Sequence, residues 1–165
     1  MKEMRPTTGK TMLALFNILG NICGRSFLDL FSGSGQIAAA AAKKGAAPVV
    51  SVESERKRHA EIVKKAPAAV KCLCIDVRRA VARFAKNDEK FDIIFADPPY
   101  DLGWGDEFPK LMAENEKILA PEGVIIFEHS EKEEPAVMDE TKWEREDRKY
   151  GGTVLSFYRR RNKDD

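Results

Sequence analysis

The sequence predicts an α/β fold in which helices cover both faces of a doubly wound, mostly parallel sheet of seven strands. Over residues 26–128, short apolar runs typical of buried strands alternate with stretches that have helical spacing. Alternation of this kind gives a parallel sheet with crossover helices. Two further strand-like runs meet at Gly151-Gly152, a hairpin signal. This hairpin is expected to add an antiparallel strand at an edge of the sheet.

Each expected element has a local cause in the sequence. Apolar side chains recur with helical spacing over residues 8–20, and Thr8 is a suitable helix cap. The strand at 26–31 runs into the turn Ser32-Gly33-Ser34-Gly35, which opens an alanine-rich helix. Ser54 is expected to cap the basic helix that ends by Pro67. The remaining expectations are helices at 36–44, 77–86 and 106–119, and strands at 49–53, 70–75, 91–96, 123–128, 142–150 and 153–159.

Length and composition favour one domain over residues 1–165, with residues 1–24 forming a helical segment packed on it. The net charge of +1 neither favours nor excludes nucleic acid as a partner. The first residues lack the apolar core of a signal peptide, and no stretch approaches the roughly 20 apolar residues of a membrane span. We therefore expect a cytoplasmic monomer that does not bind a membrane.

The cysteines and histidines do not predict a metal site. Cys72 and Cys74 stand two apart in a strand-like run, so both are expected to point to one face as small buried residues. His59 and His129 lack the spacing of metal ligands. No metal is expected.

Acidic residues stand at or near the ends of the first three expected strands, beside the glycine-rich turn. Glu53 stands at the distance at which dinucleotide-binding folds place their ribose acid, so a nicotinamide cofactor has to be considered. Asp29, at the mouth of the turn, would repel a pyrophosphate but attract a cation. S-adenosylmethionine has no phosphate and carries a sulfonium and an ammonium. We therefore expect this cofactor, with Glu53 accepting hydrogen bonds from its ribose and Asp76 from its adenine amine.

The stretch Asp97-Pro98-Pro99-Tyr100 follows the apolar run Phe91 to Ala96. Taken alone, it is a strand followed by a rigid turn, because two prolines fix the backbone. At the carboxyl end of a parallel strand it also offers a carboxylate, a carbonyl and an aromatic ring to a ligand. The Asp97 carboxylate and the Pro98 carbonyl can accept the two hydrogens of an amine on a base, which aims the nitrogen lone pair at a methyl group. Tyr100 can stack on the base.

These motifs resemble those of known enzymes. Asp29-x-Phe31-x-Gly33-x-Gly35 resembles the cofactor loop of Rossmann-fold methyltransferases, and Asp97-Pro98-Pro99-Tyr100 resembles the signature of methyltransferases that act on amino groups. More narrowly, Arg5-Pro6-Thr7-Thr8, Leu15-Phe16-Asn17 and Tyr150-Gly151-x-Thr153 resemble the RsmD family. The resemblance implies methylation of guanine N2 in small-subunit (16S) ribosomal RNA, with S-adenosylhomocysteine as product and ribosomal RNA or the small subunit as partner.

Together, the residues and the resemblance give a set of expected site residues. They are Asp97, Pro98 and Tyr100 for catalysis; Asp29, Phe31, Gly33, Gly35, Glu53, Asp76 and Asp97 for the cofactor; and Arg5, Thr7, Pro99, Tyr100 and Trp104 for the substrate.

Other interpretations stay open at this point. The same signature fits adenine-N6 methylation of DNA or RNA, and an inactive methyltransferase-like module could bind RNA without turnover. Trp104 could line the substrate entrance or anchor the following helix. A group of cations on two helices could bind RNA phosphates or form an ordinary solvated surface. That group comprises Arg56, Lys57, Arg58, Lys64, Lys65, Arg78, Arg79 and Arg83.

Overall fold

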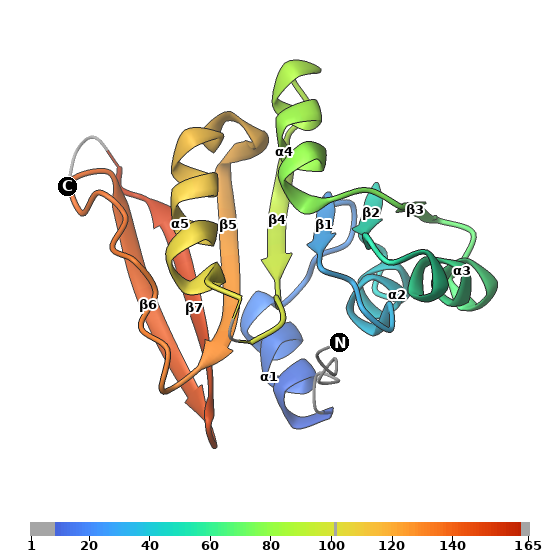
Figure 1. The fold of residues 1–165 in the computed structure, drawn as a ribbon, viewed down its shortest axis with the longest axis horizontal. Coiled ribbons are helices and arrows are strands. Elements are labelled where there is room, and N and C mark those ends of the chain that lie inside the picture. Colours follow the sequence, from blue (N-terminus) through green and yellow to red (C-terminus); the bar gives the residue numbers. More distant parts are fainter. Residues whose placement is uncertain (1–8, 101, 163–165) are drawn as a thin grey trace.

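A computed structural model describes residues 9–100 and 102–162 of the chain (Figure 1). The described helices are α1 (Gly9–Leu19), α2 (Gln36–Lys43), α3 (Arg56–Lys65), α4 (Val77–Lys86), α5 (Trp104–Glu114) and the short 3-10 helix η1 (Glu116–Ile118). The described strands are β1 (Phe27–Leu30), β2 (Val49–Val52), β3 (Val70–Leu73), β4 (Phe91–Ala96), β5 (Leu119–Ser130), β6 (Trp143–Tyr150) and β7 (Thr153–Arg160).

The seven strands form one sheet in the order β3-β2-β1-β4-β5-β7-β6. The pairs from β3 to β5 are all parallel, whereas β7 is antiparallel to both β5 and β6. The predicted α/β class and the seven-stranded, mostly parallel sheet are therefore confirmed. The chain runs outward from β1 to β3 and then crosses to β4, so the direction of winding reverses between β1 and β4. Ligands bind outside the carboxyl ends of the strands at such a switch point.

The C-terminal hairpin adds an antiparallel strand at an edge of the sheet, as predicted. That edge strand is β6, and β7 lies between it and β5. The side chains of β7 are buried from Thr153 to Tyr158, whereas β6 is largely exposed. Its sequence, Trp143-Glu-Arg-Glu-Asp-Arg-Lys-Tyr150, is rich in charge, which protects an open edge from pairing with other chains.

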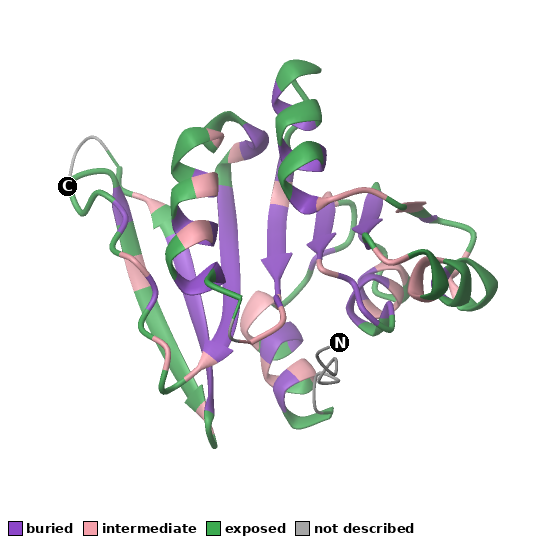
Figure 2. Ribbon diagram, in the orientation of Figure 1, coloured by how far each residue is buried: buried purple, intermediate pink, exposed green. Residues whose placement is uncertain are grey.

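Apolar cores fill both faces of the sheet (Figure 2). On one face, α4 and α5 cover the sheet and bury residues such as Val81 and Phe108. On the other face, Phe16 of α1 and Ala41 of α2 pack in a cluster that also contains Phe27. The alternation of faces along each strand explains why both sets of helices are needed.

The observed helix starts correct two expectations. Ser54 does not cap α3; the cap position belongs to Glu55, whose side chain makes no capping hydrogen bond. The expected helix at 106–119 is divided into α5, which begins at Trp104 after the left-handed Gly103, and η1. Thr8 lies outside the described residues. The expectation that Cys72 and Cys74 are both buried is wrong, because β3 ends at Leu73 and leaves Cys74 exposed, while Cys72 is partly buried. Among the described residues, no helix is both long enough and apolar enough to span a membrane.

Candidate active site

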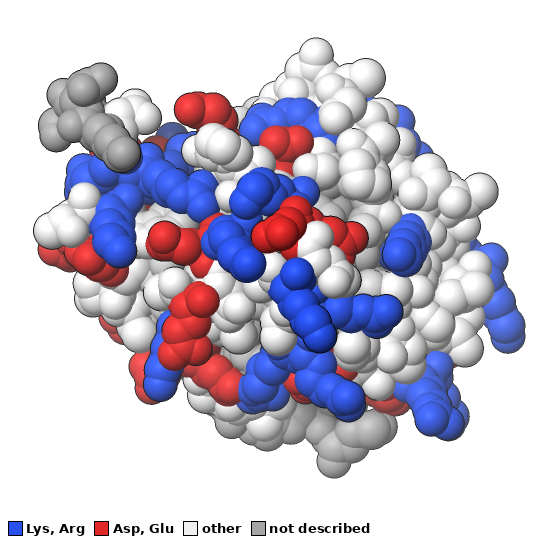
Figure 3. Space-filling view, turned by 90° about the horizontal axis from the view of Figure 1, so that it is seen from above, with Lys and Arg blue, Asp and Glu red and all other residues white. Residues whose placement is uncertain are grey.

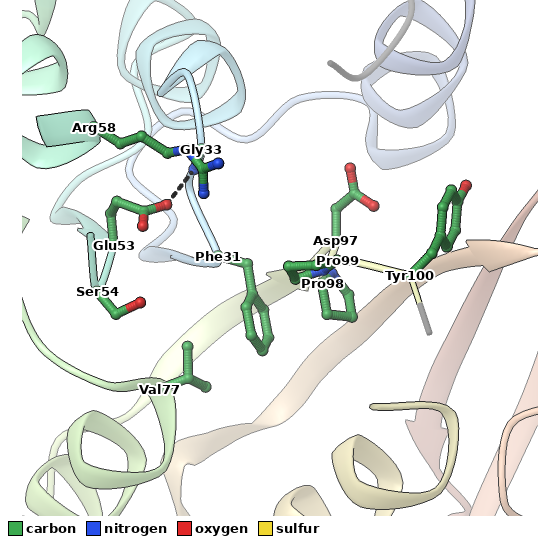
Figure 4. Close-up of a pocket in the computed structure, with 10 residues that line it drawn as sticks. All are labelled: Phe31, Gly33, Glu53, Ser54, Arg58, Val77, Asp97, Pro98, Pro99 and Tyr100. Atoms are coloured by element: carbon green, nitrogen blue, oxygen red, sulfur yellow. Dashed lines mark hydrogen bonds between the residues drawn. The ribbon is translucent and has the colours of Figure 1, made fainter. Parts of the chain in front are cut away.

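A pocket opens at the carboxyl ends of β1, β2 and β4, at the switch point of the sheet (Figure 4). It is lined by Phe31, Gly33, Glu53, Ser54, Arg58, Val77, Asp97, Pro98, Pro99 and Tyr100. The fold thus brings most of the expected site residues to one cavity, although they come from distant parts of the chain.

The turn after β1 has an unusual backbone. Phe31, Gly33 and Gly35 have φ values of 62°, 56° and 80°, in the left-handed region that L side chains rarely adopt. A Cβ atom on Gly35 would lie 3.1 Å from Ile62 Cγ2 of α3, so this glycine permits close packing as well as the turn. Gly35 itself precedes α2 and does not line the pocket.

The carboxylate of Glu53 is buried and held in one orientation. Its side chain follows β2, and the residue is 6% exposed. The backbone N–H of Gly33 donates to Oε1 (3.0 Å), and the backbone N–H of Glu55 donates to Oε2 (2.8 Å). A carboxylate has about four acceptor positions, so both oxygens can still accept hydrogen bonds from a ligand. A fixed acceptor that lines the pocket is what the ribose hydroxyls of a nucleoside require.

Asp29 lies behind the pocket rather than in its lining. The residue is 1% exposed, and Oδ2 has no hydrogen-bond partner among the described residues. The pKa of this carboxyl is raised from 3.8 to about 8, mainly by burial and to a smaller extent by the neighbouring Asp97 and Glu53, against the lowering effect of hydrogen bonds from Ser32 and the Ala38 backbone. A buried acid beside two other acids makes this end of the sheet favourable for a cationic group.

The loop after β4 provides the other side of the pocket. Pro98 is buried, whereas Asp97, Pro99 and Tyr100 are partly exposed. In Figure 4, the Asp97 carboxylate and the Tyr100 ring project toward the same side of the loop. The rigid proline pair therefore presents an acceptor and an aromatic ring side by side, as a flat amino-bearing ring would need.

Besides Asp29 and Gly35, two further expected site residues lie outside the pocket lining. Asp76 caps α4: Oδ1 accepts hydrogen bonds from the backbone N–H groups of Arg78 (2.9 Å) and Arg79 (3.4 Å). Trp104 is 6% exposed, with its ring packed against Phe31, so the anchoring interpretation of Trp104 agrees with the structure. Arg5 and Thr7 lie outside the described residues.

Sequence reasoning missed three residues of the lining. The sequence pattern predicts Ser54 as a helix cap, Val77 as a core residue and Arg58 as part of the basic helix surface. Ser54 and Val77 each follow an expected cofactor acid by one residue, and Arg58 stands one helical turn after Ser54. Their closeness in sequence to Glu53 and Asp76 is the signal that could have identified them as pocket residues. The Arg58 guanidinium forms an ion pair with Glu55, with Nη1 and Oε2 3.1 Å apart.

The basic groups do not form a uniform surface on the face seen in Figure 3. Viewed from above, Lys and Arg side chains lie among Asp and Glu side chains. The use of the basic helix residues in RNA binding stays a prediction.

Within residues 9–100 and 102–162, no group of three or more His, Cys, Asp or Glu side chains is arranged to hold a metal ion.

Comparison with known proteins assigns the family. The model of the family described as "Conserved hypothetical protein 95" matches residues 1–159. The chain belongs to this family. The predicted membership of the RsmD family is confirmed by relatives that carry its name. Ribosomal RNA small subunit methyltransferase D of Haemophilus influenzae is 30% identical in an alignment 144 positions long, which covers 83% of this chain and 73% of the relative. YlbH of Bacillus subtilis is 30% identical in an alignment 174 positions long, gaps included, which covers 95% of this chain and 88% of YlbH.

Solved structures agree with the fold. The yhhF protein of Escherichia coli has a TM-score of 0.81 at 23% identity, covering 95% of this chain and 88% of that one. An RNA methyltransferase of Salinibacter ruber, solved in complex with S-adenosyl-L-homocysteine, has a TM-score of 0.67 at 16% identity, covering 94% and 93%. The chain of this RsmD-like protein therefore has the methyltransferase fold along nearly its whole length.

Proposed function

We propose that this RsmD-like protein is an S-adenosylmethionine-dependent methyltransferase that modifies the exocyclic N2 amine of a guanine in small-subunit (16S) ribosomal RNA. The observation that carries the proposal is the shared pocket, in which Glu53 stands on one side and Asp97-Pro98-Pro99-Tyr100 on the other. The relatives named ribosomal RNA small subunit methyltransferase D support ribosomal RNA as the substrate class. The guanine N2 position follows from the resemblance of the motifs.

The residues present fit the proposed cofactor. Glu53 offers fixed acceptors for ribose hydroxyls, and Phe31 and Val77 offer apolar surface for a purine. The acids Glu53 and Asp97, which line the pocket, suit a cationic ligand and oppose a pyrophosphate, which argues against a nicotinamide dinucleotide. A cation bound beside them would also favour ionisation of the buried Asp29 carboxyl. When bound, S-adenosylmethionine supplies a methyl group on a positively charged sulfur. Asp76, Gly33 and Gly35 belong to the same proposed cofactor site.

The loop after β4 provides the groups that would act on the substrate. The Asp97 carboxylate and the Pro98 carbonyl accept the two hydrogens of the amine, which frees the nitrogen lone pair from the ring. These hydrogen bonds strengthen as the nitrogen becomes positive, so they lower the barrier as well as orient the base. Asp97 or water then takes the released proton. Tyr100 and Pro99 hold the ring of a base that has left its helix.

Labelled methyl transfer tests the proposal. Small ribosomal subunits, or their RNA, are incubated with the protein and labelled S-adenosylmethionine, and the modified nucleoside is identified by mass spectrometry. We expect N2-methylguanosine. N6-methyladenosine would show that the base has been assigned wrongly, and the absence of any cofactor binding in calorimetry would overturn the enzymatic proposal in favour of an RNA-binding module.

Asp97→Asn tests the role of the loop. Removal of one charged acceptor is expected to slow methyl transfer at least about 100-fold, while the affinity for S-adenosylhomocysteine changes by less than about five-fold. Asp106→Asn is the matched control, because Asp106 is exposed in the first turn of α5 and does not line the pocket. Equal rates for Asp97→Asn and Asp106→Asn would rule out the proposed mechanism.

A further inference from the structure

The indole of Trp104 lies between two side chains from different parts of the fold. The edge of Phe31 meets it with ring centroids 4.7 Å apart and an interplanar angle of 75°. The Arg78 guanidinium lies over the indole, with Cζ 4.4 Å from the ring centroid. Phe31 lines the pocket, so Trp104 supports one of its walls from behind. Arg78 in turn covers Trp104 on the solvent side.

Several hydrogen bonds hold Arg78 in this position. Its Nε donates to Glu107 Oε1, and its Nη2 donates to Glu107 Oε2 over 2.6 Å. Its Nη1 lies 3.4 Å from Asp76 Oδ2. The paired contact with Glu107 uses the planar fork of arginine, which fixes the guanidinium more closely than a single contact would. The first turns of α4 and α5 are thereby tied together.

Both helix starts are connected to the pocket. Val77, in the first turn of α4, lines the pocket next to Asp76. Trp104 begins α5 and packs against the pocket residue Phe31. Phe31 has a left-handed backbone (φ 62°), a conformation that its surroundings must maintain. One contact group therefore joins the turn after β1 to the starts of α4 and α5.

We propose that Arg78 is a positioning residue that acts through Trp104 to hold Phe31 in place in the wall of the pocket, where the cofactor would bind. The inference rests on the proposed function, since it concerns binding at the same pocket. The Arg78 and Glu107 side chains are 48% and 37% exposed, and exposed ion pairs add little to folding stability. Loss of Arg78 is therefore expected to alter binding more than folding.

The test is the affinity of the full chain for S-adenosylhomocysteine, measured by calorimetry. Arg78→Met keeps an unbranched side chain but loses the charge and the fork. It is expected to weaken binding about five-fold, the size of one cation–π contact at a partly exposed site, and to raise the KM for S-adenosylmethionine more than it lowers kcat. Arg79→Met is the matched control, because the neighbouring Arg79 is exposed and contacts Asp76 only through its backbone N–H.

A double-mutant comparison tests the path through Trp104. In a Trp104→Leu background, Arg78→Met is expected to have no further effect on the affinity, because the ring on which Arg78 acts is gone. An equal loss in both backgrounds would overturn the inference, as would wild-type affinity in Arg78→Met. So would a loss of affinity matched by a lower urea midpoint, which indicates a purely structural role. Failure of the wild-type protein to bind S-adenosylhomocysteine would instead overturn the proposed function.

Discussion

Replacement of Asp29 by asparagine is expected to change the pH dependence of folding stability. The Asp29 carboxyl has a pKa of about 8 in the folded chain because it is buried, against 3.8 when exposed. Between these two values the unfolded chain has lost the proton and the folded chain keeps it. Folding therefore binds a proton in this window, and the stability of the wild-type protein falls as the pH rises toward 8.

The size of the effect follows from the two pKa values. One proton difference corresponds to about 1.36 kcal/mol for each pH unit. Between pH 5 and pH 8, the stability of Asp29→Asn relative to the wild type is expected to increase by about 4 kcal/mol. The asparagine amide brings its own cost, about 1–3 kcal/mol for an unsatisfied buried group, but this cost does not vary with pH and does not affect the slope.

Urea unfolding followed by circular dichroism at pH 5, 6, 7 and 8 measures the difference between the two proteins directly. Other titrating groups contribute to both curves and cancel. A stability difference that stays constant over this pH range would refute the reasoning, because it would mean that Asp29 is ionised in the folded chain throughout. An acid retained at such a cost in stability is typical of a functional position.

Two further substitutions test the local structure. Gly35→Ala would place a Cβ atom 3.1 Å from Ile62 Cγ2 at a φ of 80°, so chemical denaturation should show that the free energy of unfolding falls by about 1–2 kcal/mol. Gly152→Ala, with nothing within 4 Å of the added Cβ, should be nearly neutral, and equal losses in the two variants would contradict this explanation. Arg160→Met removes donors to the carbonyl oxygens of Glu116, Leu119 and Ala120, and it is expected to lower the free energy of unfolding by about 1–3 kcal/mol in the same assay. The exposed Arg159→Met is the control and should change stability little. Similar stability of the two variants would show that water replaces these contacts without cost.

The sequence by itself determined the class of fold and most of the pocket. Its alternation of apolar runs and helical patterns fixes the parallel sheet, because buried strands and crossover helices require those periods. The glycines of the turn after β1 and the prolines after β4 constrain the backbone locally, so their effect can be predicted without knowing which distant residues contact them. For the same reason Phe31, Gly33, Glu53 and Asp97 could be assigned to one site from their places at strand ends.

The tertiary structure decided the roles that depend on contacts between distant segments. Asp76 follows the expected strand, and only the structure shows that its carboxylate also caps α4, because the nearest free N–H groups belong to that helix. Trp104 stands near Tyr100 in sequence but is buried against Phe31 and covered by Arg78, two residues 26 or more positions away. The order of β6 and β7 likewise depends on which strand can bury its side chains. These roles and this strand order follow from packing and charge pairing between distant segments, and a local sequence pattern does not predict such contacts.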